Sequence, residues 1–398
     1  MKILHVIPSL SPSSGGPSFA LPAIARSLQP HGVEVHVATT DDDGPGMRRT
    51  GVPLGQEIPQ EGGWTLRYFA KQTEFYKVSL PLRHWLREHA ADYDLVHVHA
   101  LFSFASLAGA RAALRSRVPY IIRPLGVLNR WGMENRRRWV KALSFRMLEL
   151  PLLKSAAAVH YTSGMERQDA ARFVLGNHQA VIPIGIDVEP FQKLPSASMF
   201  AQKHPEVAAS RNLLFLSRVD VKKGLDLLIA AFALVAPQHA DLRLIICGEG
   251  DPALLTALKQ QAEALGLNGR ITWAGQVSGE MRLAAFAAAE MFVLPSHSEN
   301  FGIALLEAMA AGLPCISTDQ VALAADAARV SAVKIAERDP HRLAQAIKEL
   351  LASETQRLQL SQAACRVACE DYSLEAMGRG LYKLYQDVTH CNITTPSK

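Results

Sequence analysis

The sequence of 398 residues has few of the features that mark secreted or membrane-spanning proteins. Its longest uninterrupted apolar run, from Leu227 to Ala236, has ten residues, whereas a helix that spans a bilayer needs about twenty. There are five cysteines, an odd number, and they include no C-x-x-C pair. We therefore expect reduced thiols in a cytoplasmic protein, with no disulfide framework and no zinc site.

An excess of charge of one sign is also lacking. The formal net charge is +5, from 42 Lys and Arg against 37 Asp and Glu, which gives no reason to expect nucleic acid as a partner. Hydrophobic residues make up 48% of the chain, enough for sizeable cores. A chain of this length and composition predicts two large domains.

Short β-branched runs alternate with longer amphipathic stretches, and this pattern occurs twice along the chain. The alternation is typical of parallel sheets joined by helical crossovers, so it predicts two Rossmann-like α/β domains. Between them, the stretch 184–211 is expected to be a linker because it is rich in proline and serine, and no strand is expected after residue 317. The expected strands are 3–7, 33–38, 94–99, 118–122, 156–160, 180–183, 212–217, 242–247, 270–273, 290–294 and 314–317.

Ligands of such sheets bind beyond the carboxyl ends of the strands, so the residues that contact a ligand are expected in the segments that follow the strands. Gly15 and Gly16 precede the first helix and form either a plain turn or a backbone contact to a phosphate. His97 and His99 end a later strand and share one face; a metal site there is disfavoured because no third ligand is apparent. The acidic run 41–43 is expected to be a solvated loop.

Basic residues follow the first strand of the second half. Arg218, Lys222 and Lys223 precede Gly224 and a predicted helix. Arginine grips phosphate oxygens in a bidentate manner and lysine acts as a point charge, so the segment is either a phosphate site or a solvated basic turn.

The strongest local signal follows the strand 290–294. Glu299 lies in a loop, and Glu307 lies about one turn into a helix that is predicted to start near Gly302 or Ile303. Gly302 allows close backbone approach, and the helix start offers unpaired N–H donors to a diphosphate. Glu307 lies in an apolar stretch, where a solvated helix would not place a carboxylate, and its oxygens suit a ribose diol.

The E-x7-E element formed by Glu299 and Glu307, with Phe301-Gly302 inside it and 308–314 after it, resembles that of the retaining glycosyltransferases of family 4, which have the GT-B fold. The resemblance covers nearly the whole chain. The other matching segments follow in order: Gly15-Gly16, His99, Arg218 with Lys223-Gly224, Gly248-Glu249-Gly250 and Gly275-Gln276-Val277.

The resemblance implies an acceptor-binding domain at 1–190, with the helix near 373–390 packed back on it, and a nucleotide-sugar-binding domain at 191–372. It also implies roles for single residues. Catalytic roles fall to His99, Glu299, Arg218 and Lys223. Donor contacts fall to Gly15, Gly16, Gly275, Val277, Gly302, Ile303, Ala304 and Glu307. Arg123 and Trp131 lie on the acceptor side.

The implied activity is transfer of a sugar from a nucleotide-sugar donor to a hydroxyl of a glycan or lipid-linked glycan, as in cell-surface polysaccharide assembly. Arg218, Lys223 and the helix start would stabilise the leaving diphosphate, so no metal cofactor is expected. Two alternatives on the same fold remain, a sugar-nucleotide epimerase and a nucleotide-sugar-binding scaffold.

The stretch 123–154 is strongly basic. It contains eight basic and two acidic residues, so its net charge of +6 exceeds that of the whole chain. With its interleaved aromatic and leucine residues it is either a helix with a solvated face or an amphipathic surface for an anionic membrane. The second interpretation predicts a cytoplasmic enzyme that is peripheral on the inner membrane face.

Overall fold

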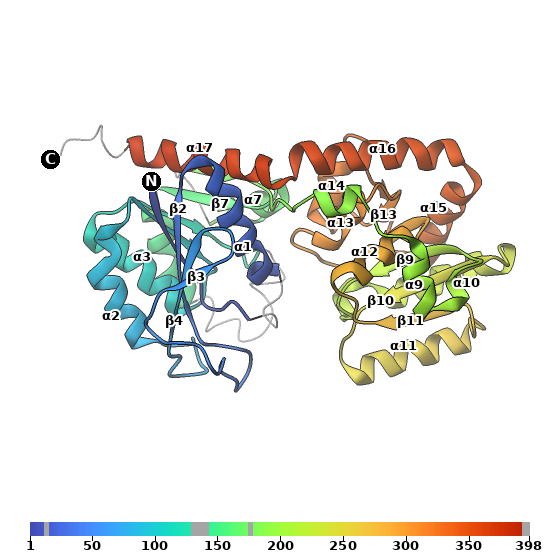
Figure 1. Cartoon of the computed structure of the whole chain (residues 1–398), viewed down its shortest axis with the longest axis horizontal. Coiled ribbons are helices and arrows are strands. Elements are labelled where there is room, and N and C mark those ends of the chain that lie inside the picture. Colours follow the sequence, from blue (N-terminus) through green and yellow to red (C-terminus); the bar gives the residue numbers. More distant parts are fainter. Residues whose placement is uncertain (12–15, 129–142, 174–177, 392–398) are drawn as a thin grey trace. The chain divides into compact units, whose positions relative to one another are not determined.

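The computed structural model describes residues 1–11, 16–128, 143–173 and 178–391, and these form two compact α/β units (Figure 1). Unit 1 contains Met1–Gly185 together with the C-terminal segment Leu374–Lys398, and unit 2 contains Ile186–Ser373. Each unit is built on its own mostly parallel sheet, which confirms the predicted fold class of two Rossmann-like domains.

Unit 1 has an eight-stranded sheet in the order β3-β4-β2-β1-β5-β6-β7-β8. Only the pair β3 and β4 is antiparallel. The strands are β1 (Lys2–Val6), β2 (Glu34–Thr40), β3 (Ile58–Gln60), β4 (Trp64–Phe69), β5 (Leu95–His99), β6 (Tyr120–Arg123), β7 (Ala158–Tyr161) and β8 (His178–Val181).

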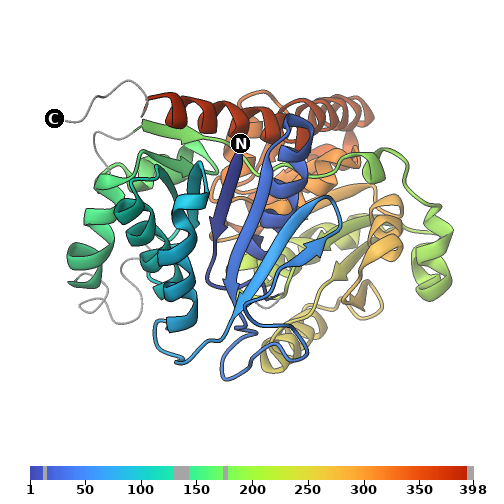
Figure 2. The same cartoon turned by 60° about the vertical axis from the view of Figure 1, so that its left-hand side comes forward.

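Helices cover both faces of this sheet. Alternating residues along β1 face two apolar layers: Leu4 and Val6 pack towards α2, α3 and α6, whereas Ile3 packs towards α1 and α17. Figure 2 shows α17 running along the unit beside α1. The helices are α1 (Gly16–Leu28), α2 (Leu80–His89), α3 (Phe104–Ser116), α6 (Leu150–Ser155), α7 (Gly164–Ala170) and α17 (Leu374–Cys391), with short turns η2 (Gln29–His31), η3 (Ala90–Asp92) and the π-helical η4 (Phe145–Glu149).

Unit 2 has a six-stranded parallel sheet in the order β11-β10-β9-β12-β13-β14. Since all its strands are parallel, their carboxyl ends meet at one edge, which is where the predicted donor-binding residues follow. The longest apolar run of the sequence forms the core helix α10, which explains its length without a membrane. The strands are β9 (Arg211–Leu216), β10 (Leu242–Cys247), β11 (Ile271–Gly275), β12 (Met291–Leu294), β13 (Cys315–Ser317) and β14 (Lys334–Ile335).

The helices of unit 2 connect these strands and continue beyond the sheet. They are α8 (Glu189–Gln192), α9 (Ala197–Lys203), α10 (Leu225–Val235), α11 (Pro252–Ala264), α12 (Gly279–Ala287), α13 (Ile303–Ala310), α14 (Ala322–Ala328), α15 (Pro340–Ala352) and α16 (Glu354–Asp371), with short turns η5 (Pro205–Val207), η6 (Val221–Lys223) and η7 (Ala236–Gln238). Among the described residues, no helix combines the length and the apolar character that crossing a bilayer requires.

All eleven predicted strands are present, but the expectation of no strand after residue 317 is wrong, because β14 pairs with β13. The sequence interpretation also missed β3, β4 and α2. β14 has two residues and β3 has three, too few to show a periodicity.

The interpretation of 184–211 as a linker is wrong as well. This segment contains α8, α9 and η5, and it buries Phe191, Phe200 and Val207 in unit 2. Pro190 and Pro205 lie in the first turns of α8 and η5, and the hydroxyl of Ser196 caps α9. Proline and serine therefore mark helix starts here.

The acidic run 41–43 is not a solvated loop. The Asp42 carboxylate is fully buried and forms ion pairs with Lys71, at 2.8 Å, and with Lys77. Asp41 accepts a hydrogen bond of 2.6 Å from the backbone N–H of Lys71. The lysines that follow β4 supply the compensating charge, and sequence spacing did not reveal this partnership.

Candidate functional site

In unit 2, glycines bring the loops at the carboxyl edge of the sheet into backbone contact. A Cβ atom on Gly224 would lie 2.1 Å from the carbonyl oxygen of Pro295, and one on Gly248 would lie 1.9 Å from that of Ser217. A Cβ on Gly250 would lie 2.0 Å from the carbonyl oxygen of Val219. The loops after β9, β10 and β12 thus pack directly on one another because these residues have no side chain.

Lys223 and Glu299 are brought together at this edge. Lys223 ends η6, and its ammonium forms an ion pair with the Glu299 carboxylate. The Glu299 backbone N–H donates to the carbonyl of Gln320 at 3.0 Å, which fixes the loop that carries the carboxylate. The structure therefore joins two of the four predicted catalytic residues.

Burial lowers the pKa of Lys223 to about 8, and the positive charge of Arg218 acts in the same direction. The ion pair with Glu299 opposes both effects because it stabilises the charged ammonium. Arg218 itself is exposed and lines a pocket of about 430 Å³ together with Asp220 and Gly250. A buried lysine beside an exposed arginine is an arrangement that an anionic ligand would complete.

The start of α13 offers backbone donors beside this pair. Gly302 has a φ of 104°, and a Cβ there would lie 2.7 Å from Val321 Cγ1. The first N–H bonded within the helix is that of Leu306, which donates to Gly302 at 3.1 Å. The N–H groups of Ile303 and Ala304 consequently lack an intrahelical acceptor, as the predicted diphosphate contact needs.

Glu307 is buried on α13, and its partner was missed in the sequence. Burial raises the pKa of this carboxyl, and the guanidinium of Arg282, 2.8 Å away, opposes the rise. Arg282 belongs to α12, which follows the loop of Gly275 and Val277. Gly275 ends β11 with a φ of 66°, and its carbonyl accepts from the Gly248 N–H at 2.7 Å. In the sequence, the position of Arg282 shortly after that loop is the only sign that it could be the partner of Glu307.

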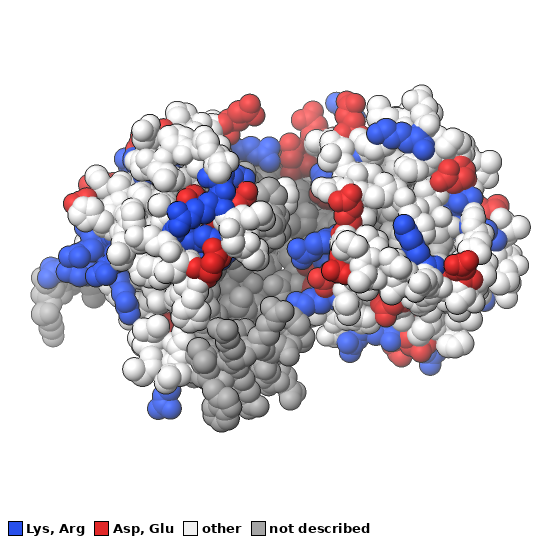
Figure 3. All heavy atoms as spheres, turned by 90° about the horizontal axis from the view of Figure 1, so that it is seen from below, with Lys and Arg blue, Asp and Glu red and all other residues white. Residues whose placement is uncertain are grey.

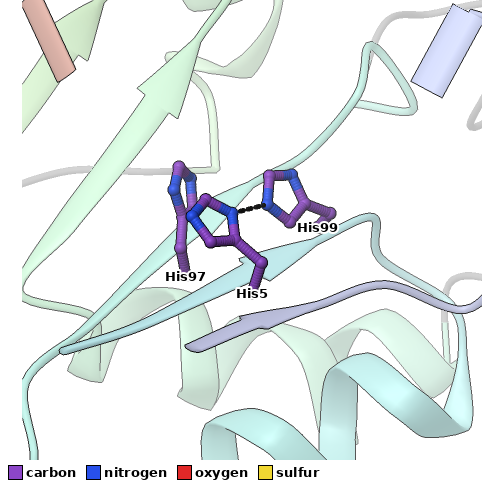
Figure 4. A group of neighbouring side chains, drawn as sticks. All are labelled: His5, His97 and His99. Carbon is purple, nitrogen blue, oxygen red and sulfur yellow. Dashed lines mark hydrogen bonds between the residues drawn. The ribbon is translucent and has the colours of Figure 1, made fainter. Parts of the chain in front are cut away.

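In unit 1, a buried cluster of histidines surrounds His99 (Figure 4). The rings of His97 and His99 stack on one face with centroids 4.4 Å apart, as their two-residue spacing predicts. His5 of β1 supplies the third ring, and its Nδ1 lies 2.9 Å from Nε2 of His99. The expectation that no third nitrogen ligand exists is wrong, because the three rings offer nitrogens within 4.8 Å of one another.

The surroundings of the cluster favour neutral imidazoles and disfavour a cation. Burial lowers the pKa of all three histidines, that of His5 to about 3, and the buried guanidinium of Arg123 adds to the effect. Nε2 of His5 and Nε of Arg123 have no hydrogen-bond partner among the described residues. A divalent ion here would be repelled by Arg123, so we do not assign a metal site to the cluster.

The hydrogen-bond partners of His97 determine which of its ring nitrogens donates and which accepts. His160 Nε2 lies 2.9 Å from the carbonyl of Ile182, which only accepts, so this nitrogen carries the proton. Nδ1 of the neutral His160 then accepts from His97 Nε2 at 3.3 Å, and His97 Nδ1 accepts from the Tyr385 hydroxyl at 2.8 Å. Helix α17 thereby holds the rings beneath His99.

The remaining predicted residues have simple positions. Gly16 begins α1 and is exposed, and Arg123 ends β6 with 2% of its surface exposed. Arg123 therefore adds no charge to a basic surface over 123–154. Gly15 and Trp131 lie outside the described residues, as does the central part of that stretch.

Comparison with known proteins gives the family. Residues 199–367 match the family described as "Glycosyl transferases group 1", and residues 15–185 match the "Glycosyl transferase 4-like domain". The chain belongs to the GT-B glycosyltransferases. The resemblance seen in the E-x7-E element is thus confirmed over both units of this glycosyltransferase.

Two relatives and one solved structure show the range of similar proteins. The D-inositol 3-phosphate glycosyltransferase of Corynebacterium urealyticum is 27% identical over 314 residues, 76% of this chain and 73% of the relative. The GDP-mannose:cellobiosyl-diphosphopolyprenol alpha-mannosyltransferase of Xanthomonas campestris is 25% identical over 80% of this chain and 79% of the relative. Other curated relatives are matched over about half of their own length.

HepE of Anabaena, solved in complex with UDP-glucose, has the same fold. Its TM-score is 0.74 with 20% sequence identity, and the match covers 97% of this glycosyltransferase and 100% of that chain.

Proposed function

We propose that this glycosyltransferase is a retaining, metal-independent hexosyltransferase that uses a nucleoside diphosphate sugar. The observation that carries the proposal is the ion pair of Lys223 and Glu299, with the guanidinium of Arg218 and the unpaired N–H groups at the start of α13 in the same unit. These groups supply the positive charge and the backbone donors that a diphosphate requires.

The proposed mechanism follows the charge that develops in the reaction. Cleavage of the anomeric C–O bond leaves positive charge on the sugar and negative charge on the diphosphate. Arg218, Lys223 and the α13 N–H groups stabilise the leaving diphosphate, and Glu299 faces the positive charge on the sugar. The acceptor hydroxyl attacks from the same face, and the leaving phosphate oxygen takes its proton, which retains the anomeric configuration.

The donor nucleotide and sugar are assigned to separate contacts. Glu307, held by Arg282, binds the ribose hydroxyls, and Gly275 and Val277 flank the base. Gly16 contacts the β-phosphate and His99 contacts the sugar. A carboxylate that is oriented by an arginine accepts hydrogen bonds from a diol without further reorganisation.

We further propose that the acceptor is a glycan or lipid-linked glycan of cell-surface polysaccharide assembly and that the enzyme works at the cytoplasmic membrane face. The Xanthomonas relative is named for a diphosphopolyprenol acceptor, which is a lipid-linked glycan. Arg123 and Trp131 are proposed to lie on the acceptor side.

The proposal is tested first by thermal denaturation with UDP-, GDP- and ADP-sugars, with magnesium and with EDTA. A donor at 100 times its Kd should stabilise the protein by about 2.7 kcal/mol. We expect one nucleotide to raise Tm equally in both conditions, and the Glu307→Ala variant to lose the shift. A shift that required magnesium would overturn the metal-independent mechanism.

The reaction itself is tested with the donor so identified and a set of polyprenyl-diphosphate glycans, with NMR of the product. The anomeric configuration of the transferred sugar should equal that of the donor, and inversion would contradict the mechanism. Release of an epimerised nucleotide sugar would favour the epimerase alternative. Donor binding with no turnover on any acceptor would favour the scaffold.

A further inference from the structure

Helices α2 and α3 pack side by side in unit 1 and form a groove on the outer surface. Leu82 and Leu86 of α2 and Ala108 and Ala112 of α3 are buried. Between the exposed faces of the two helices lies a pocket of about 330 Å³. Its lining consists of Arg83, Arg87, Phe104, Leu107, Ala108, Arg111, Ala112, Leu114 and Arg115.

Four exposed arginines line this groove, two on each helix. Arg83 and Arg87 are four residues apart on α2, and Arg111 and Arg115 are four residues apart on α3, so each pair shares one helix face. No carboxylate lies within 4 Å of any of the four guanidinium groups among the described residues. In Figure 3, Lys and Arg side chains gather along the left-hand edge of the unit, the side where Figure 1 draws α2 and α3.

Neither α2 nor α3 supplies a carboxylate that pairs with the four arginines. Helix α3 contains no Asp or Glu, and Glu88 of α2 lies next to His84, with its carboxylate 3.2 Å from the imidazole. The buried carboxylate of Glu149 accepts hydrogen bonds from the Tyr76 hydroxyl at 2.5 Å and from the Phe102 N–H at 3.1 Å, and it interacts electrostatically with Arg111. Like charges at this spacing repel one another, so an external anion would stabilise this cluster of four guanidinium groups.

Large apolar side chains are exposed beside the groove. Leu80 at the start of α2 is 51% exposed and Leu114 is 43% exposed. Further along the same surface, Phe75 is 64% exposed, Leu143 65% and Met147 67%.

Two hydrogen bonds tie these apolar residues to the groove. The Tyr76 hydroxyl lies 3.0 Å from that of Ser144, which joins the neighbours of Phe75 and Leu143. The Phe104 N–H donates to the carbonyl of Tyr76 at 2.9 Å, which joins both to α3. The buried faces of α2, α3, η4 and α6 belong to one apolar layer on the sheet, so the exposed arginines and apolar residues lie on the outer side of that layer, which we call the α2–α3 surface.

We propose that the α2–α3 surface docks on an anionic phospholipid bilayer. The four guanidinium groups bind lipid phosphates, and Phe75, Leu143 and Met147 enter the interfacial layer of the membrane. A soluble phosphate compound would use the arginines and leave these apolar side chains in water, so the combination favours a lipid surface. The proposed lipid-linked acceptor gives the reason why the enzyme would dock on a membrane. The docking itself can be measured without any substrate.

The test is co-sedimentation of the full chain with vesicles of 30% phosphatidylglycerol in phosphatidylcholine and with pure phosphatidylcholine. Wild-type protein should bind the anionic vesicles, with affinity that falls as salt rises, and leave the neutral vesicles largely unbound. Replacing the four arginines by glutamine (R83Q, R87Q, R111Q and R115Q) should lower the vesicle affinity by at least about tenfold.

A matched control removes four exposed cations from unit 2: K203Q, K259Q, R338Q and R342Q. It changes the net charge by the same amount and should keep the vesicle affinity within about twofold. A second variant, with glutamine at Phe75, Leu143 and Met147, should weaken the binding that persists at high salt.

Three outcomes would overturn the proposal: equal loss in both charge variants, equal binding to neutral vesicles, or a Tm rise with inorganic pyrophosphate that needs the four arginines while vesicles stay unbound. The last would indicate a small-anion site. Donor affinity is measured in parallel and should be unchanged in the arginine variant. If the wild-type protein bound vesicles but no donor, the proposed function would fail while the docking surface stood.

Discussion

At the scale of single residues, Lys223 makes the donor site sensitive to pH. Its pKa is lowered to about 8 by burial, and only the charged ammonium attracts the donor diphosphate. As pH rises through 8 the free enzyme loses this proton, so donor affinity should fall by about tenfold between pH 7 and pH 9. Isothermal titration of the donor at several pH values measures the effect.

The Lys223→Arg variant is the control, because a guanidinium stays charged over this range. Its donor affinity should change little between pH 7 and pH 9, whatever its absolute value. If the wild-type protein and the variant showed the same pH dependence, another group would be responsible.

Arg282 compensates the charge of buried Glu307, so its removal should destabilise unit 2 in a pH-dependent way. Without the guanidinium, the pKa of Glu307 rises further above its unfolded value. The folded state then binds the extra proton, so stability is kept at low pH and lost as pH rises through the folded pKa. We expect Arg282→Met to cost about 1–3 kcal/mol at pH 8 and less at pH 5.

Urea denaturation of Arg282→Met at both pH values measures this, and the double variant with Glu307→Gln should remove the pH dependence. A loss in the single variant that is equal at pH 5 and pH 8 would show that Arg282 acts by packing alone.

At the scale of elements, one glycine sets how closely α17 approaches α1. A Cβ atom on Gly378 would lie 2.1 Å from the carbonyl oxygen of Ser27, and backbone atoms cannot move away as a flexible side chain would. Gly378→Ala should therefore separate the two helices and lower the free energy of unfolding by about 1–3 kcal/mol. Urea denaturation followed by circular dichroism measures the change.

Gly164→Ala serves as the matched substitution, since a Cβ at Gly164, in the first turn of α7, would meet nothing within 4 Å. Its stability should stay within about 0.5 kcal/mol of the wild-type protein. Equal stability of Gly378→Ala and the wild-type protein would mean that α17 shifts without cost.

The elements also show how far sequence patterns reach. Strands such as β1 and β10 are largely apolar and buried along their length, which is why they were predicted, whereas β4 alternates buried and partly exposed residues and was missed. The edge strand β3 is three residues long and contains Pro59, so its pattern is that of a loop. The linker prediction failed because proline and serine occur both in loops and at helix starts, and only packing of Phe200 distinguishes the two.

The candidate site was predicted in part for a similar reason. Glu299, Glu307 and the glycines follow strands at fixed spacing, so their positions can be predicted from nearby sequence alone. Arg282 and His5 are partners chosen by tertiary packing, across α12–α13 and β1–β5 contacts that no spacing encodes. Sequence reasoning therefore found the residues of each loop and missed the charges and hydrogen bonds that join one element to another.

At the scale of the whole molecule, the proposed donor contacts divide between the units in a testable manner. Contacts to the nucleotide and diphosphate belong to unit 2, through Arg218, Lys223, Glu307 and the start of α13, apart from the proposed contact of Gly16 in unit 1 to the β-phosphate. The proposed contact to the sugar through His99 belongs to unit 1. A nucleoside diphosphate without sugar should therefore affect the two units differently from the complete donor.

Hydrogen exchange of backbone amides measures this difference, with the nucleotide identified by thermal denaturation. The nucleoside diphosphate alone should slow exchange in 217–224, 248–251 and 299–307, because bound ligand suppresses local opening of those loops. The complete donor should slow exchange in the same segments and also in 95–106, which contains His99 and the turn after β5. Because His99 is only 1% exposed, slower exchange around it would mean that the donor sugar orders this segment. If the exchange rates in 95–106 stayed unchanged while the segments of unit 2 were protected, His99 would be removed from the donor contacts and the diphosphate site would stand.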